Sequence, residues 1–146
     1  MKTKIISKIL LSLGLLFVLG STITQVHGQV ITIQSAGDVT RGETGLFILT
    51  MNPPPPPDGG MYVNFSVSGT AVAGVDYVPL VSPAYIPGCR GNFCVPGVGL
   101  IAIKTLPDPR GPVNRQSYSV VVTVKPGLGY SVGQPSSAQM MIKPSP

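Results

Sequence analysis

The stretch GTAVAGVDY, residues 69–77, decides which fold is expected of this chain. It directly follows residues 61–68, MYVNFSVS, in which apolar and polar side chains alternate as in a β-strand with one buried face. In such a strand, Val63, Phe65 and Val67 would point to one side of the sheet and their neighbours to the other. The pattern therefore predicts a strand that leads directly into residues 69–77.

The strand signal recurs along the whole chain. Residues 117–125 alternate in the same way, and no window after residue 28 has the apolar spacing of an amphipathic helix. Five shorter apolar runs have the length of strands: residues 30–34, 46–51, 84–86, 100–106 and 138–143. About seven strands separated by Gly, Pro, Asn or Asp predict one all-β domain, and they favour a β-sandwich over a barrel.

The first 28 residues have the layout of a secretory signal peptide. Three lysines lie within the first eight residues, an apolar segment follows at residues 9–19, and residues 26–28 precede a cleavage point before Gln29. The alternative is a retained membrane anchor, because the run from residue 9 to residue 26 approaches the length of a membrane span. Polar residues dilute its second half, which favours cleavage.

Cleavage would leave one domain at residues 29–143 and a short tail at residues 144–146, with no membrane span. We expect this protein to be exported, as a secreted, periplasmic or cell-surface protein. The full chain has a formal net charge of +5, but only seven basic residues remain after residue 28, against five acidic ones. These charges are scattered singly and form no basic stripe with aromatic side chains, so we expect no nucleic-acid binding.

Residues 69–77 and the order of the segments around them resemble the Calx-beta domain family. The further segments that carry the resemblance are VTRGE at residues 39–43, YIPG at residues 85–88, and the strand-like residues 100–108, 118–124 and 137–142. The likeness covers about residues 30–143, but only residues 69–77 are specific to the family. The resemblance implies an immunoglobulin-like antiparallel β-sandwich of about seven strands.

The resemblance also raises the question of calcium. In calcium-binding members the ligands are an early glutamate, the aspartate of the Asp-Tyr pair and an acidic run after a later strand. Asp76 matches the pair and Asp108 matches the first acidic residue of the run, whereas Arg41 stands where the early glutamate would be. Glu43, two residues later, is a substitute for that glutamate, and Arg110 would add positive charge to the same end.

The remaining acidic positions of the family fall on Pro109, Val113 and Gln116. Because calcium takes about six to eight oxygen ligands, several of them carboxylates, the predicted metal site is weak and largely degenerate. The resemblance gives Asp76, Asp108 and Glu43 as its residues, with calcium an optional ligand and no cofactor required. The other interpretation of Asp76 is structural, with its carboxylate accepting hydrogen bonds from its own tight turn.

Two further patterns bear on chemistry. Cys89 and Cys94 lie close together in a chain expected to be exported, which predicts a disulfide between them. The single histidine, His27, lies in the predicted signal peptide, so the exported part lacks the histidine of Ser-His and Cys-His catalysis. Glu43 is its only glutamate, and no acidic pair in one motif suggests general acid and base. We therefore expect that the protein is not an enzyme.

A run of five prolines, residues 53–57, predicts a loop stiffened toward polyproline II. We favour a stiff connecting loop, and a docking site for a proline-binding domain is the alternative. Taken together, the sequence predicts an exported, non-enzymatic structural or adhesive binding module whose partner is an unidentified protein or surface glycan. The alternative is a calcium-responsive binding module with a weak site at one end of the sandwich.

Overall fold

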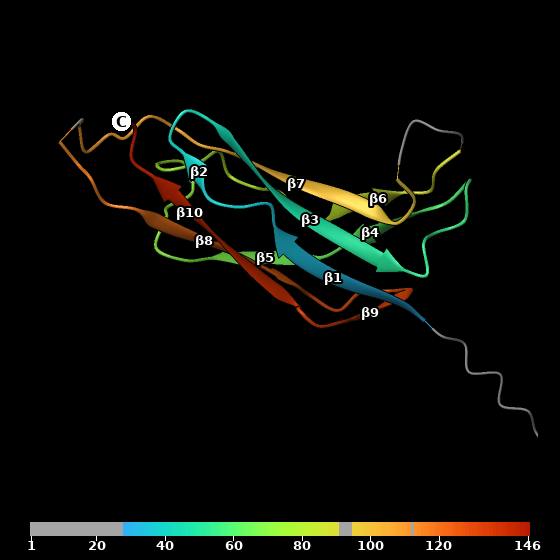
Figure 1. The fold of residues 1–146 in the computed structure, drawn as a ribbon. Helices are drawn as coiled ribbons and strands as arrows, with labels where there is room; N and C mark the ends of the chain where they lie inside the picture. Colours follow the sequence, from blue (N-terminus) through green and yellow to red (C-terminus); the bar gives the residue numbers. More distant parts are fainter. Residues whose placement is uncertain (1–27, 91–94, 112) are drawn as a thin grey trace, which may run out of the picture.

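The computed structural model describes residues 28–90, 95–111 and 113–146. This part of the chain contains ten strands and no helix. Two four-stranded sheets pack face to face as a sandwich, and a third sheet has two strands (Figure 1). The all-β sandwich expected from the sequence is therefore confirmed. The predicted signal peptide lies outside the described residues except for Gly28.

The first sheet has the strand order β7-β3-β1-β9. Strands β1 and β3 pair antiparallel, as do β3 and β7, whereas the short β9 runs parallel to β1 at the edge. The bounds of these strands are β1 Gln29–Ser35, β3 Thr44–Asn52, β7 Val98–Lys104 and β9 Tyr130–Val132.

The second sheet has the order β2-β10-β8-β5, and the third pairs β4 with β6. Strand β10 lies between β8, with which it pairs antiparallel, and β2, with which it pairs parallel. The bounds are β2 Val39–Thr40, β5 Phe65–Ser68, β8 Tyr118–Val124, β10 Ser137–Lys143, β4 Gly60–Val63 and β6 Ala84–Pro87.

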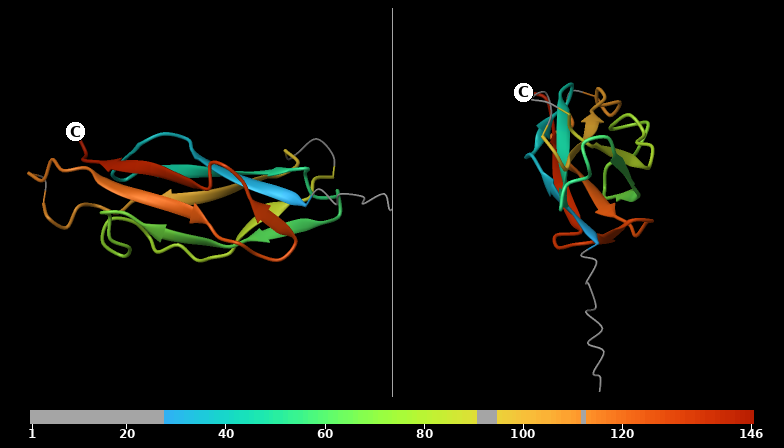
Figure 2. Two further views of the ribbon diagram at one scale, coloured as in Figure 1. Left: turned by 90° about the horizontal axis from the view of Figure 1, so that it is seen from below. Right: turned by 90° about the vertical axis from the view of Figure 1, so that its right-hand side faces the viewer.

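The core lies between the sheets and follows the predicted alternation. In the first sheet, strand β3 buries Phe47, Leu49 and Met51, and in the second sheet β8 buries valines at every second position, Val120 among them. Successive side chains of a strand point to opposite faces, so each strand contributes one apolar row. Figure 2 shows the long direction of the sandwich: the loop that follows β7 lies at one end, with the C-terminus, and the loop that follows β3 lies at the other.

The sequence predicted one strand over residues 61–68, but the structure has two strands in different sheets. The change occurs at Asn64, whose main-chain N–H donates to the Tyr130 hydroxyl at 2.9 Å and whose carbonyl accepts from the Lys125 N–H at 2.8 Å. Val63 and Phe65, on either side, are both buried in the same core. Alternation therefore continues through the break, which is why the sequence pattern did not show it.

Strands β2 and β9 were also missed, because runs of two and three residues are too short to show a period. Together with the break at Asn64, they account for ten strands where about seven were expected. None of the described segments is a helix long and apolar enough to cross a membrane.

Candidate functional site

Residues 69–77 fold into a turn that is fixed to β8. Gly69 has a φ of +121°, and a side chain at this position would collide with the carbonyl oxygen of Ser119. The Ala71 N–H donates to that same carbonyl at 2.9 Å, and the Thr70 N–H donates to the Ser119 hydroxyl at 3.0 Å. Glycine is required here both for the backbone conformation and for the close approach of two chain segments.

Asp76 closes the turn with its own side chain. Its carboxylate accepts from the Val72 N–H at 2.8 Å, and its own N–H donates to the Val72 carbonyl at 2.8 Å. Tyr77 is buried in the core, and the Leu106 N–H donates to the Asp76 carbonyl at 2.9 Å. The hydrogen bond expected from the structural interpretation of Asp76 is therefore present, and it fixes the carboxylate beside the end of β7.

The Asp76 carboxylate is fully buried and lies between two arginines. Arg41 Nη2 is 2.5 Å from Asp76 Oδ1, and Arg110 donates to both carboxylate oxygens, at 2.7 and 3.2 Å. The Arg41 side chain is only 2% exposed, whereas that of Arg110 is 33% exposed. Arg41 also donates to the Leu106 carbonyl at 3.1 Å. Two charge-assisted interactions thus offset the desolvation of one buried carboxylate.

Asp108 joins the same group from the loop after β7. Its carboxylate accepts from the Arg110 main-chain N–H at 3.0 Å and from the Asn114 amide at 2.7 Å. Arg110 Nη1 is 3.2 Å from Asp108 Oδ1, and Arg41 Nε is 3.4 Å from Asp108 Oδ2. Each arginine therefore lies close to both aspartates. We call Arg41, Asp76, Asp108 and Arg110 the Arg-Asp cluster.

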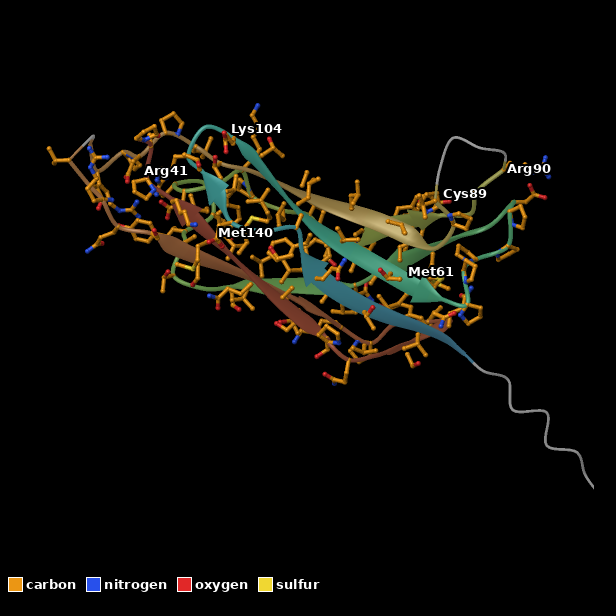
Figure 3. All side chains as sticks on the ribbon, in the orientation of Figure 1. Arg41, Met61, Cys89, Arg90, Lys104 and Met140 are labelled. Atoms are coloured by element: carbon orange, nitrogen blue, oxygen red, sulfur yellow. The ribbon has the colours of Figure 1, made fainter. Side chains whose placement is uncertain are left out.

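Tyr118, the first residue of β8, lies against both arginines of the cluster. Its ring centroid is 4.2 Å from the Arg110 guanidinium carbon and 5.5 Å from that of Arg41. Both distances are within the range of a cation–π interaction. The Asn114 amide also donates to the Tyr118 hydroxyl at 3.2 Å. The Arg-Asp cluster, whose two positive and two negative charges cancel, therefore joins the strands and loops at this end of the sandwich (Figure 3 labels Arg41).

The pKa of both aspartates lies below the ordinary value. Burial acts to raise the pKa of Asp76, but hydrogen bonds from Arg110, Arg41 and the Val72 N–H outweigh it and hold the pKa well below its usual range. Burial also opposes the shift at Asp108, where the Arg110 N–H, the Asn114 amide and the two guanidinium groups lower the pKa. The Asp76 carboxylate in turn raises the pKa of Arg110. Both aspartates and Arg110 are therefore charged at neutral pH.

These shifts predict that acid destabilises the protein through the cluster. A carboxyl whose pKa is lowered by folding stabilises the native state above its unfolded pKa, about 4, and this stabilisation is lost as pH falls toward the folded pKa. We expect the urea midpoint to be flat from pH 7 to about 5 and to fall steeply below about pH 4. In the Asp76→Asn variant the fall should be shallower. An equal acid dependence in both proteins would contradict this assignment.

Glu43 is not part of the cluster, although the sequence grouped it with Asp76 and Asp108. Its carboxylate lies 3.4 Å from the Thr40 N–H, and its carbonyl accepts from the Thr105 hydroxyl at 2.7 Å. The structure therefore brings together two of the three predicted metal ligands. Among the residues that the structure describes, no group of three or more His, Cys, Asp or Glu side chains is arranged to hold a metal ion.

The sequence identified both aspartates and placed Arg41 and Arg110 at the same end of the domain. It did not predict that the arginines bind the aspartates directly, or that Tyr118 and Asn114 take part. The one sequence signal for these arginine–aspartate ion pairs was Arg41 itself, which stands where the resemblance expects a glutamate. Cys94 lies outside the described residues, so the Cys89–Cys94 disulfide stays a prediction.

Comparison with known proteins adds no identification. No protein-family model and no curated protein matches the chain. The interpretation of this site therefore depends on the residues of the chain and on their geometry.

Proposed function

We propose that this chain is an exported, non-enzymatic structural or adhesive binding module of the Calx-beta type, with an immunoglobulin-like sandwich and no need for calcium. One observation carries the proposal. The two aspartates that would be calcium ligands, Asp76 and Asp108, are both bound by arginines of the same chain. The partner would be a protein or a surface glycan.

The fold supports the Calx-beta part of the proposal. The specific stretch, residues 69–77, follows directly on β5 and forms a tight turn that Asp76 closes, at an end of a two-sheet sandwich. Residues 100–108, which the resemblance aligned with a strand ending in an acidic residue, run from β7 into the loop that carries Asp108. The positions of this turn and of Asp108 are compatible with the resemblance and support the proposal.

The charges at the cluster support the second part of the proposal, that the protein does not need calcium. A calcium ion needs about six to eight oxygens at short range, with several negative charges among them. Here the two carboxylates are neutralised by two guanidinium groups, and one of these, Arg41, is almost fully buried. A calcium ion bound between Asp76 and Asp108 would have to displace both arginines and leave Arg41 beside a divalent cation. Electrostatics therefore oppose binding, and the arginines supply the positive charge that holds the loops together.

Thermal unfolding in calcium and in chelator tests this proposal. Because a ligand that binds only the native state raises the unfolding midpoint with concentration, we expect the same midpoint in 1 mM calcium, roughly a physiological extracellular level, and in excess EDTA. A rise at sub-millimolar calcium would contradict the proposal and support the calcium-responsive alternative.

An arginine variant sharpens this test. Arg110→Ala would remove one of the two arginines that contact both aspartates, leaving Arg41 in place. Arg115→Ala is a matched control because Arg115 binds only the Ser145 carbonyl in the described part of the chain. If an arginine occupies the place of a metal, calcium should stabilise the Arg110 variant and leave the Arg115 variant unchanged.

A further inference from the structure

The proline run forms an ordered, exposed ridge at the end of the sandwich opposite the Arg-Asp cluster (Figure 3 labels Arg90 and Cys89 at this end). Within the run, Pro55 is buried and the other four prolines are exposed. We call the four exposed residues, Pro53, Pro54, Pro56 and Pro57, the proline ridge.

Hydrogen bonds hold this loop in place. The Gly59 N–H donates to the Pro56 carbonyl at 2.9 Å, and the Gly88 N–H donates to the Gly59 carbonyl at 2.6 Å. On the other side, the Met51 N–H donates to the Gly97 carbonyl at 2.7 Å. A side chain at Gly88 would collide with the Pro56 and Gly59 carbonyls, so the two loops are in close contact. The ridge is therefore preordered, which reduces the entropic cost of binding it.

Two exposed tyrosines lie next to the ridge. Tyr62 of β4 and Tyr85 of β6 are directly opposite in the antiparallel pair, with ring centroids 4.9 Å apart. They are 65% and 48% exposed, respectively. A side chain at Gly60 would collide with the Tyr85 ring, so this ring extends over the start of β4, directly after the proline loop. We call Tyr62 and Tyr85 the tyrosine pair.

We propose that the proline ridge and the tyrosine pair form a self-complementary surface through which two copies of this chain associate as a symmetric dimer. Proline-rich segments are recognised by grooves lined with aromatic side chains, and this chain displays both components side by side. In a twofold dimer, a contact from one surface element to another is made twice. Each ridge would therefore pack against the tyrosine pair of the second copy.

The charges at the rim are compatible with association of identical surfaces. Asp58, directly after the ridge, forms an exposed ion pair with Arg90. Their opposite charges leave this rim without a net charge, so two copies would not repel each other here. The proposal does not depend on the calcium or family arguments above.

Sedimentation velocity of the purified protein over a range of concentrations tests the dimer. The two surface variants are Tyr62→Ser with Tyr85→Ser, and Pro54→Ser with Pro57→Ser. The matched control is Leu128→Ser, a 95% exposed apolar residue in the turn before β9. We expect a concentration-dependent dimer for the wild type and the control, and association weakened at least about ten-fold in each double variant, as for interface hot spots. Thermal unfolding would verify that all variants are folded.

A mixing experiment distinguishes this arrangement from unspecific hydrophobic contact. The tyrosine variant retains an intact ridge, and the proline variant retains an intact tyrosine pair, so a mixed dimer could form one of the two contacts. We expect the mixture to associate more strongly than either variant alone and more weakly than the wild type. A monomeric wild type, unaffected double variants, or a mixture no stronger than its components would each overturn the proposal.

Discussion

Replacing Asp76 with alanine should lower the free energy of unfolding by about 3–5 kcal/mol, the cost of breaking a buried ion pair by removing one member. The variant would leave Arg41, whose side chain is 2% exposed, without its 2.5 Å contact. It would also leave the Val72 N–H without its acceptor and remove the two hydrogen bonds that Arg110 donates to Asp76. Urea denaturation at pH 7 measures the loss directly.

Two variants show where this loss comes from. Asp76→Asn keeps an oxygen acceptor for the turn but removes the charge, so most of the destabilisation should remain if the ion pairs dominate. Asp38→Asn is the matched control, because its ion pair with Lys143 joins two exposed side chains. Pairs of that kind contribute little to stability. Equal losses in the Asp38 and Asp76 variants would refute the special role of the cluster.

Replacing Gly69 with alanine should destabilise the protein by about 2–6 kcal/mol, because a strained φ costs about 1–3 kcal/mol and overpacking costs about as much again. The backbone at Gly69 has a φ of +121°, and the added methyl group would collide with the Ser119 carbonyl. Relief of this collision would require the turn to move away from β8, and the Asp76 carboxylate would move with it. Chemical denaturation gives the magnitude.

Gly37 provides an informative control for this variant. It has a φ of +128°, close to that of Gly69, but no atom lies within 4 Å of a side chain added there. Gly37→Ala therefore measures the conformational cost alone, and the difference between the two variants measures the contact with Ser119. If both substitutions cost the same, close packing of the turn on β8 is not important.

Much of the fold could be predicted because apolar alternation is a local property. The prediction over residues 117–125 corresponds to β8, in which Val120, Val122 and Val124 are buried. It succeeded because the side of the sheet to which a side chain points depends only on its position in the strand. The sheet to which a strand belongs is not local. At Asn64 the chain passes from the third sheet to the second, yet Val63 and Phe65 still face one core.

The site was less predictable, for a related reason. Asp76 was identified from a short motif, but its partners Arg41 and Arg110 are 35 and 34 residues away in the chain. Spacing alone also grouped Glu43 with the two aspartates, whereas the structure places its carboxylate outside the Arg-Asp cluster. Gly42, with a φ of +89°, turns the chain between Arg41 and Glu43, and the arginine is buried while the glutamate carboxylate stays at the surface. Only the folded loops determine which of these charges meet.

The central position of β10 has a consequence for how the molecule is made. The last strand of the domain, Ser137–Lys143, is inserted between β2 and β8 instead of being added at an edge. During synthesis from the N-terminus, the second sheet therefore lacks one of its two inner strands until almost every residue of the domain has been joined. Pairings between segments so distant in sequence form slowly, and domains tend to fold as units. The nascent chain should thus remain open to chaperones and proteases throughout translation, and close into a sandwich only when synthesis of the domain is finished.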